Sequence, residues 1–289
     1  MELLRALENY SDDMGNVVLY EGEPIEKPVS IRFRGTGNVL EVASDAKIIE
    51  LSVEFFGNNG RVQIAGTPLP RTGLRFGIRV GHDSTVSIGK NVGSQSRTFI
   101  VASEGADVSI GEDCMLASGI ETRTDDSHPI YDVRTQERVN LARSIHIGDH
   151  VWIGKFVAIL GGASVGNGSV VGFRSVLTRK IPNNCVAAGV PARVLRKDIA
   201  WERPKLNARK PGQTSVPAKE KHDEYWNLTD FESEVPAIKA SPRRQIQSAN
   251  EAGYSQIAKK KSPKRSLPLA RQLRRAAHKL KNSVKKTFG

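Results

Sequence analysis

Residues 122–143 form a long polar stretch that contains the side chains best suited to chemistry. His128 lies here, directly before Pro129, which stiffens the backbone, and Asp126 lies two residues earlier. A neutral imidazole can accept a proton near pH 7, so His128 is a candidate general base. We expect Asp126 either to orient this imidazole or to bind a substrate, and Asp125 to be solvated.

The chain that follows is organised in units of six residues. One aliphatic residue recurs without a slip at Ile147, Ile153, Ile159, Val165, Val171 and Leu177. A period of six matches neither an α-helix nor a half-buried strand, and it is typical of a parallel β-helix built from hexapeptide units. Three units make one coil of about 18 residues. A glycine-rich β-sandwich is the alternative fold.

A longer repeat precedes the hexapeptide units. Aliphatic-x-aliphatic triplets follow polar turns at residues 40–42, 62–64, 86–88 and 108–110, at spacings of 22 to 24 residues. The next triplet, 145–147, does not come until 37 residues after the last of these. The β-helix is therefore predicted to begin near Val29, and residues 122–143 leave it as an extruded loop, where function is often found. Leu3, Leu4 and Leu7 suggest a short helix within residues 1–16.

Charge separates the C-terminal third from this body. Residues 196–289 hold 23 Lys and Arg against 9 Asp and Glu, an excess larger than the net charge of +12 of the whole chain. The predicted organisation is an N-terminal segment (1–28), an all-β domain (29–196) with its extruded loop, a largely disordered linker (197–266) and a basic amphipathic helix (267–289). Four aromatic residues of the linker are candidates to dock onto the body: Trp201, Tyr225, Trp226 and Phe231.

The basic tail allows three interpretations. An amphipathic basic helix is typical of contact with an anionic membrane surface or a polyanionic polymer. A solvated tail is the second interpretation, and salt-sensitive, non-specific nucleic-acid contact is the third, although the aromatic interleaving of single-strand binders is absent. No specific nucleic-acid partner is therefore predicted.

The remaining composition favours a cytoplasmic protein, with peripheral attachment at the inner membrane face as an extension. Cys114 and Cys185 form neither a disulfide framework nor a metal motif. The N-terminus lacks the pattern of a signal peptide, and no apolar run is long enough to span a membrane.

Residues 151–172, 175–184 and 188–194 resemble the hexapeptide-repeat acyltransferases, which include the galactoside and maltose O-acetyltransferases. Within that family, Thr-Asp-Asp-Ser-His-Pro-Ile at 124–130 is most similar to the bacterial capsule and polysialic acid O-acetyltransferases. The resemblance implies a left-handed β-helix, a homotrimer with active sites between neighbouring prisms, and acetyl-CoA as the donor. No metal is expected.

The resemblance also assigns roles. It implies that His128 is the catalytic base, with Trp152 and Asp126 beside it. Trp152 is expected on the outer face beside the inward Ile153, near the donor thioester or the acceptor; packing in the trimer is the alternative. Donor-binding positions are implied at Lys155, Phe173, Thr178, Arg193 and Arg196. Lys155 and Phe173 depart from the small residues that the family usually has there.

The predicted function is acetyl-CoA-dependent O-acetylation of a bacterial surface glycan, either a capsular polymer that could contain sialic acid or a sugar precursor. The alternatives are a non-catalytic trimeric scaffold tethered by its tail and an N-acetyltransferase for a sugar nucleotide. A metalloenzyme similar to the γ-type carbonic anhydrases would need three histidines. The histidines His82, His146 and His150 are instead interpreted as structural.

Overall fold

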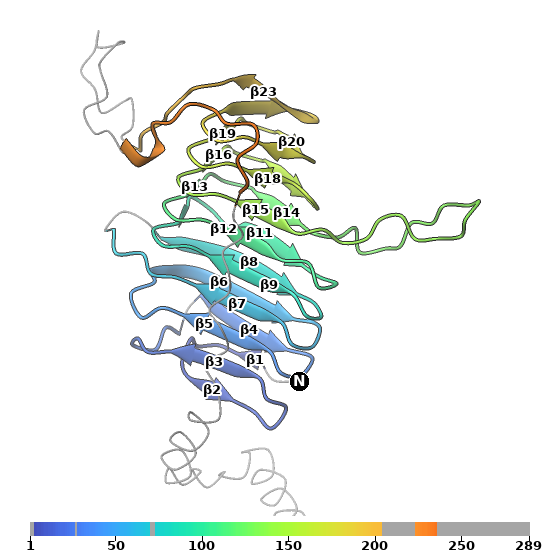
Figure 1. Ribbon diagram of the computed structural model, residues 1–289. Helices are drawn as coiled ribbons and strands as arrows, with labels where there is room; N and C mark the ends of the chain where they lie inside the picture. Colours follow the sequence, from blue (N-terminus) through green and yellow to red (C-terminus); the bar gives the residue numbers. More distant parts are fainter. Residues whose placement is uncertain (1–2, 27, 70–72, 204–222, 236–289) are drawn as a thin grey trace, which may run out of the picture. The chain divides into compact units, whose positions relative to one another are not determined.

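The protein is a parallel β-helix, seen in a computed structural model that describes residues 3–26, 28–69, 73–203 and 223–235. Its coils stack from β3 at one end to β23 at the other (Figure 1). The strands of successive coils pair in parallel and form three sheets, which are the faces of the stack. The predicted β-helix is therefore confirmed, and the β-sandwich alternative is wrong.

Two sheets run the whole length of the stack. The first consists of β1 (Leu3–Leu4), β4 (Val29–Phe33), β6 (Ile48–Phe55), β8 (Leu74–Val80), β11 (Thr98–Ala102), β14 (Glu121–Arg123), β17 (Ala158–Leu160) and β20 (Val176–Leu177). The second consists of β2 (Tyr10–Ser11), β3 (Val17–Tyr20), β5 (Val39–Val42), β7 (Arg61–Ile64), β9 (Thr85–Ile88), β12 (Val108–Ile110), β15 (Ile145–Ile147), β18 (Ser164–Val165) and β21 (Lys180–Ile181).

The third sheet begins later in the described chain. It consists of β10 (Gly93–Ser94), β13 (Met115–Leu116), β16 (Trp152–Ile153), β19 (Val170–Val171), β22 (Val186–Gly189) and β23 (Ala192–Arg196). The earlier coils have long strands in the first two sheets, which explains their spacing of 22 to 24 residues in place of 18. A short 3-10 helix, η2 (Asp223–Tyr225), follows the β-helix.

The hexapeptide residues line the interior of the stack. All six, from Ile147 to Leu177, are at most 2% exposed. Trp152 pairs with Val170 and Ala158 pairs with Val176, so successive coils are in register 18 residues apart. Burial of one such side chain contributes roughly 1.5–3 kcal/mol. One aliphatic residue per strand therefore builds a continuous core.

The predicted N-terminal helix is wrong. Leu3 and Leu4 lie in β1, which pairs antiparallel with β4, and Leu7 is fully buried in the core. The parallel stack also begins before Val29, because β3 already pairs with β5. Packing against the open end of the stack outweighs the weak helical pattern of three leucines.

The two ends of the expected linker that the structure describes pack on the β-helix. Residues 198–203, here called the strap, contact coils from β9 to β22, and residues 223–235 contact the last coils. Docking onto the body is observed for Trp201 and Tyr225, which stack on His150. Phe231 lies beside the Lys197 ammonium, and Trp226 donates to Glu202, both residues of the linker. The rest of the linker and the expected amphipathic helix (267–289) lie outside the described residues.

Candidate active site

The extruded loop leaves the stack between β14 and β15 as a narrow arm (Figure 1). Its two sides pair at their base, where the Arg143 amide donates to the Thr124 carbonyl at 3.1 Å, and further out, where the Val139 amide donates to Ile130 at 2.9 Å. Asn140 joins the sides near His128: its Oδ1 accepts from the Ile130 amide at 2.7 Å. The arm is therefore an ordered structure that presents its residues at fixed positions.

His128 is exposed near the base of this arm. The turn before it is fixed, because Ser127 adopts a left-handed φ of 64° and its amide donates to Oδ1 of Asp125 at 2.6 Å. The Ser127 hydroxyl accepts from Arg123 at 2.8 Å. Asp125 is half-buried and holds this turn, so the expectation that it is solvated is wrong.

Asp126 does not contact the imidazole in the single chain. Its Oδ2 accepts a hydrogen bond from Nδ2 of Asn140 at 3.0 Å, and the same Nδ2 donates to the carbonyl oxygen of His128 at 2.9 Å. Among the contacts of the described residues, none joins the Asp126 carboxylate to the His128 ring. Asp126 therefore positions the backbone of His128 through Asn140, a residue that the sequence pattern did not single out.

Trp152 lies on the outer face of β16. Its side chain is 39% exposed, whereas that of Ile153 is fully buried, as the alternation predicts. Its ring lies 6.0 Å from that of Trp201 at an angle of 48°. The third sheet that carries Trp152 lies away from the side on which the arm leaves (Figure 1). One chain therefore does not bring His128 and Trp152 together.

Two of the residues implied in donor binding lie at the corner between the third and first sheets. Lys155 and Phe173 occupy equivalent positions of successive coils, and both are exposed. Phe156 and Arg174 follow them, both with left-handed φ, of 60° and 54°. The phenyl rings meet edge to face at 6.0 Å.

Cations cover these rings. The Arg174 guanidinium lies 5.7 Å from the Phe156 ring and 5.4 Å from the Phe173 ring, and the Lys155 ammonium lies 5.2 Å from Phe156. Phe156 and Arg174 were not predicted; bulky residues at a turn position that favours Gly, Asn or Asp were the available signal. This corner offers apolar surface beside positive charge.

The other donor-binding candidates are spread over the last coils. Thr178 is half-buried directly after β20. Arg193 and Arg196 are exposed on β23, where Arg193 donates to the carbonyl of Ala192 at 3.0 Å. Both guanidinium groups are accessible to a phosphate.

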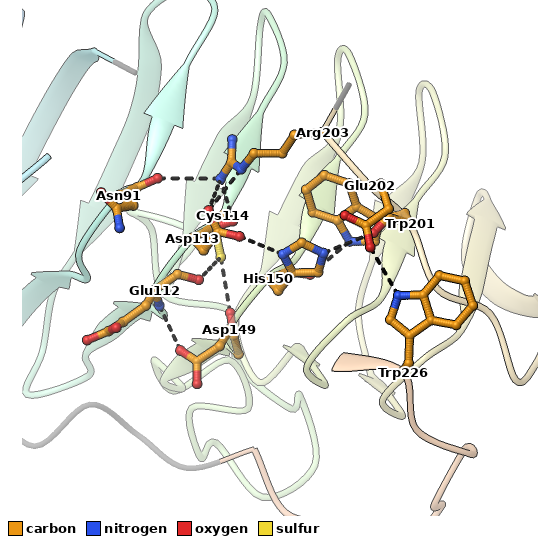
Figure 2. A network of polar contacts seen from close by, with 11 residues as sticks. Asn91, Glu112, Asp113, Cys114, Asp149, His150, Trp201, Glu202, Arg203 and Trp226 are labelled. Atoms are coloured by element: carbon orange, nitrogen blue, oxygen red, sulfur yellow. Dashed lines mark hydrogen bonds and ion pairs between the residues drawn. The ribbon is translucent and has the colours of Figure 1, made fainter. Parts of the chain in front are cut away.

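The strap crosses the corner between the second and third sheets, where the coils turn through left-handed residues (Figure 2). Nδ1 of His150 lies 2.6 Å from Oδ2 of Asp113, and Nε2 lies 3.0 Å from the Trp201 carbonyl oxygen. Nε1 of Trp201 donates to the His150 carbonyl at 2.8 Å. Arg203 donates to Oδ1 of Asp113, also at 2.8 Å.

Burial and charge set the protonation of this network. Burial alone would raise the pKa of Asp113, but the hydrogen bond from His150 and the charge of Arg203 outweigh it and hold that pKa below its usual value. Burial raises the pKa of the neighbouring Cys114 thiol to about 12. The network is a structural anchor of the strap that pattern analysis did not reveal.

The three histidines interpreted as structural make separate contacts. Nδ1 of His82 accepts from the Asn58 amide at 3.1 Å, and Nδ1 of His146 lies 2.9 Å from the Ser109 hydroxyl. Burial lowers the pKa of His146, although the charge of Asp107 opposes this effect. Within the described parts of the chain, no group of three His, Cys, Asp or Glu side chains could hold a metal ion.

Known proteins resemble this chain in sequence and in fold. The family model "Bacterial transferase hexapeptide (six repeats)" matches residues 144–179. A polysialic acid O-acetyltransferase of Escherichia coli O1:K1 is 34% identical over 126 residues, which are 44% of this chain and 38% of that protein. A polysialic acid O-acetyltransferase of Neisseria meningitidis is 35% identical over 128 residues, 44% of this chain and 58% of that protein.

The matched residues make up less than two thirds of each of these two polysialic acid O-acetyltransferases. The solved structure of the polySia-specific acetyltransferase NeuO has a TM-score of 0.56 and 30% identity, and the similarity covers 66% of this chain and 91% of that one. The chain belongs to the hexapeptide-repeat acyltransferases. As in the hexapeptide-repeat acyltransferases it resembles, the β-helix is left-handed.

No helix within the described residues is long and apolar enough to cross a membrane.

Proposed function

We propose that this protein is an acetyl-CoA-dependent O-acetyltransferase that acts on a hydroxyl of a bacterial surface glycan, with His128 as the general base. The observation that carries the proposal is an exposed histidine held by Asn140 on an ordered arm. An acetyl thioester is already activated, so the remaining requirement is a base that removes the proton of the attacking hydroxyl.

The residues of the chain divide this work. Neutral His128 takes the proton of the acceptor hydroxyl as its oxygen bonds to the acetyl carbon, and the protonated ring returns that proton to the sulfur as the C–S bond breaks. Such a base contributes about 10²–10⁴ in rate. Asp126 acts by fixing the backbone of His128 through Asn140.

The donor fits the corner between the third and first sheets. Its phosphates would meet cationic groups, and the methyl and methylene groups of its pantetheine arm would lie on the exposed phenyl rings. Trp152, on the same sheet, would line the thioester. The donor-binding set is Trp152, Lys155, Phe173, Thr178, Arg193 and Arg196.

The placement of the arm and the donor corner on different sides of one chain supports a homotrimer as part of the proposal. Since His128 and Trp152 lie on different sides of one chain, a complete site needs the arm of one copy beside the third sheet of the next. Two relatives named for polysialic acid support an anionic capsular glycan as the acceptor. The basic residues of 196–289 would hold such a polymer or an anionic membrane surface at the cytoplasmic side.

The test is thiol release from acetyl-CoA by the purified full-length protein with a panel of capsular and monomeric glycans. Release should depend on one class of glycan and should be lost in His128→Ala. Val133→Ala, at a highly exposed position of the same arm, is the matched control and should retain full activity. A His128→Ala variant with wild-type turnover would exclude this residue as the base.

Two further outcomes are informative. If no glycan supports release while CoA still raises the melting temperature, the donor assignment stands and the acceptor class is wrong. If CoA gives no thermal stabilisation either, the protein is the non-catalytic scaffold.

A further inference from the structure

The indole of Trp152 is exposed to solvent on its outer side. The centroid of its ring lies 6.0 Å from that of Trp201 of the strap. An exposed indole on a sheet face can adopt several rotamers unless a neighbour restricts it. Trp201 is itself only 7% exposed, so it is a fixed neighbour. We propose that Trp201 is a positioning residue that fixes the ring of Trp152 for the donor; this rests on the proposed function.

Trp201 is held by a reciprocal pair of hydrogen bonds with one residue. Its Nε1 donates to the His150 carbonyl at 2.8 Å, and Nε2 of His150 lies 3.0 Å from the Trp201 carbonyl, which can only accept. The two rings also stack at 4.1 Å with an angle of 13°. Both the backbone and the ring of Trp201 are therefore fixed in one arrangement.

Because only Val151 lies between His150 and Trp152, fixing the position of His150 also restricts the backbone of Trp152. His150 lies in the turn that leads into β16, and its left-handed φ of 51° sets the direction of that strand. The ring of Tyr225 stacks on the other face of its imidazole, with the ring centroids 4.5 Å apart and an angle of 7° between the ring planes. The turn that leads into Trp152 is thus the same turn that binds Trp201, and Figure 2 shows its residue His150 beside Trp201.

The strap is anchored on both sides of Trp201. On one side, Ile199 exchanges two hydrogen bonds with Asn184, at 3.0 and 2.8 Å. On the other side, Arg203 pairs with Asp113, and its guanidinium lies 5.8 Å from the Trp201 ring. These anchors leave Trp201 little freedom to move away from Trp152.

A kinetic double-mutant cycle tests the proposal in the full-length protein. Trp201→Ala should lower kcat/KM for acetyl-CoA by about tenfold, mainly by raising KM. In a Trp152→Ala background the same change should have no further effect, because Trp201 acts through the missing ring. An equal loss in both backgrounds would show a merely structural role and overturn the proposal.

A spectroscopic measurement gives an answer independent of activity. The chain has three tryptophans, so a Trp226→Phe background with Trp201 replaced leaves Trp152 as the single fluorophore. Acrylamide should quench Trp152 about twofold more strongly when position 201 is Ala than when it is Phe, since Phe retains a covering ring. Equal quenching in the two variants would contradict the proposal.

Trp226 supplies the matched control. It lies on residues 223–235, and its Nε1 donates to Glu202 of the strap at 3.0 Å. Trp226→Phe should leave kcat/KM unchanged. If the wild type shows no acetyl transfer with any glycan, the proposed function fails, whereas the quenching comparison still decides the role of Trp201.

Discussion

Asn140 and Asp126, on opposite sides of the extruded arm, are joined by a hydrogen bond of 3.0 Å from Nδ2 to Oδ2. Arg138 supports Asn140 from behind, because its Nε donates to Asn140 Oδ1 at 3.2 Å and its guanidinium pairs with Glu104 at 2.9 Å. The position of His128 therefore depends on a chain of polar contacts that begins on the β-helix itself.

Asn140→Ala should lower kcat by about tenfold while the melting temperature changes little, because the arm is exposed and the variant removes three contacts near His128. Steady-state kinetics with saturating acetyl-CoA and a thermal melt measure the two quantities. Val133→Ala is the control on the same arm. Unchanged kcat would show that the backbone of His128 holds its position without Asn140.

Subunit mixing should restore activity if the site lies between copies. His128→Ala and Trp152→Ala should each be weakly active as pure proteins. Co-expressed at equal levels, they should recover about a quarter of wild-type activity, because one interface in four pairs an intact His128 with an intact Trp152. Recovery no greater than the mean of the two variants would place the complete site within one chain.

Phe173→Ala should raise KM for acetyl-CoA roughly fivefold with kcat nearly unchanged, since it removes apolar surface and the ring that Arg174 covers. Phe231 is the matched control, because it is also exposed and also lies beside a cation, Lys197. Phe231→Ala should leave KM unchanged. Equal effects of the two substitutions would exclude a specific role of the donor corner.

The coils were predictable from sequence because each inward strand position must be aliphatic. Ile153 and Val171 follow this requirement, so the period of six is visible without any structure. The N-terminal strands were not predictable, because three leucines fit a helical turn as well as two short strands. Their conformation depends on pairing with β4, because Leu3 pairs with Arg32 and Leu4 with Ile31, far along the chain.

The lowered pKa of Asp113 predicts that the folded protein loses stability in acid. Its folded pKa is held below the unfolded value, so it contributes stability above the unfolded pKa of about 3.9, and this contribution is lost as pH falls through the folded pKa. Asp113→Asn should thus melt at a lower temperature than the wild type at pH 6, and the difference should narrow below about pH 4.

Melting curves from pH 6 to pH 3 measure this difference. Asp13→Asn, an exposed aspartate in the turn between β2 and β3, is the control and should follow the wild type at every pH. A constant difference for Asp113→Asn over the whole range would show that its carboxylate charge contributes nothing to the network.

Both cysteines should be unreactive in the folded protein. Burial raises the pKa of Cys114 to about 12 and also raises that of Cys185, so little thiolate is present at pH 8. A disulfide reagent should label neither thiol quickly, and should label both after denaturation. Rapid labelling of Cys185 in Cys114→Ala would show that residues 223–235, whose Thr229 lies 3.6 Å from its sulfur, open readily.

The sequence reveals the candidate site itself better than the strap beside it. His128 and Trp152 were singled out because their neighbours resemble a known family, and their roles in the site stay predictions. Trp201 was expected to dock onto the body, but its partner His150 and the part played by Arg203 were not predicted, because the contact between Arg203 and Asp113 joins residues 90 positions apart and the strap has no periodicity. Only the folded stack brings the left-handed turn residues into the row that the strap binds.

The strap bonds to four such turn residues, Asn184, His150, Asp113 and Asn91, each from a different coil. In a solenoid every coil otherwise touches only its neighbours, so coils at an end can open one at a time. A segment bonded to four of the five coils between β9 and β22 removes this freedom. The backbone amides from β10 to β22 should therefore exchange with solvent as one cooperative unit, and the C-terminal end should be as protected as the middle.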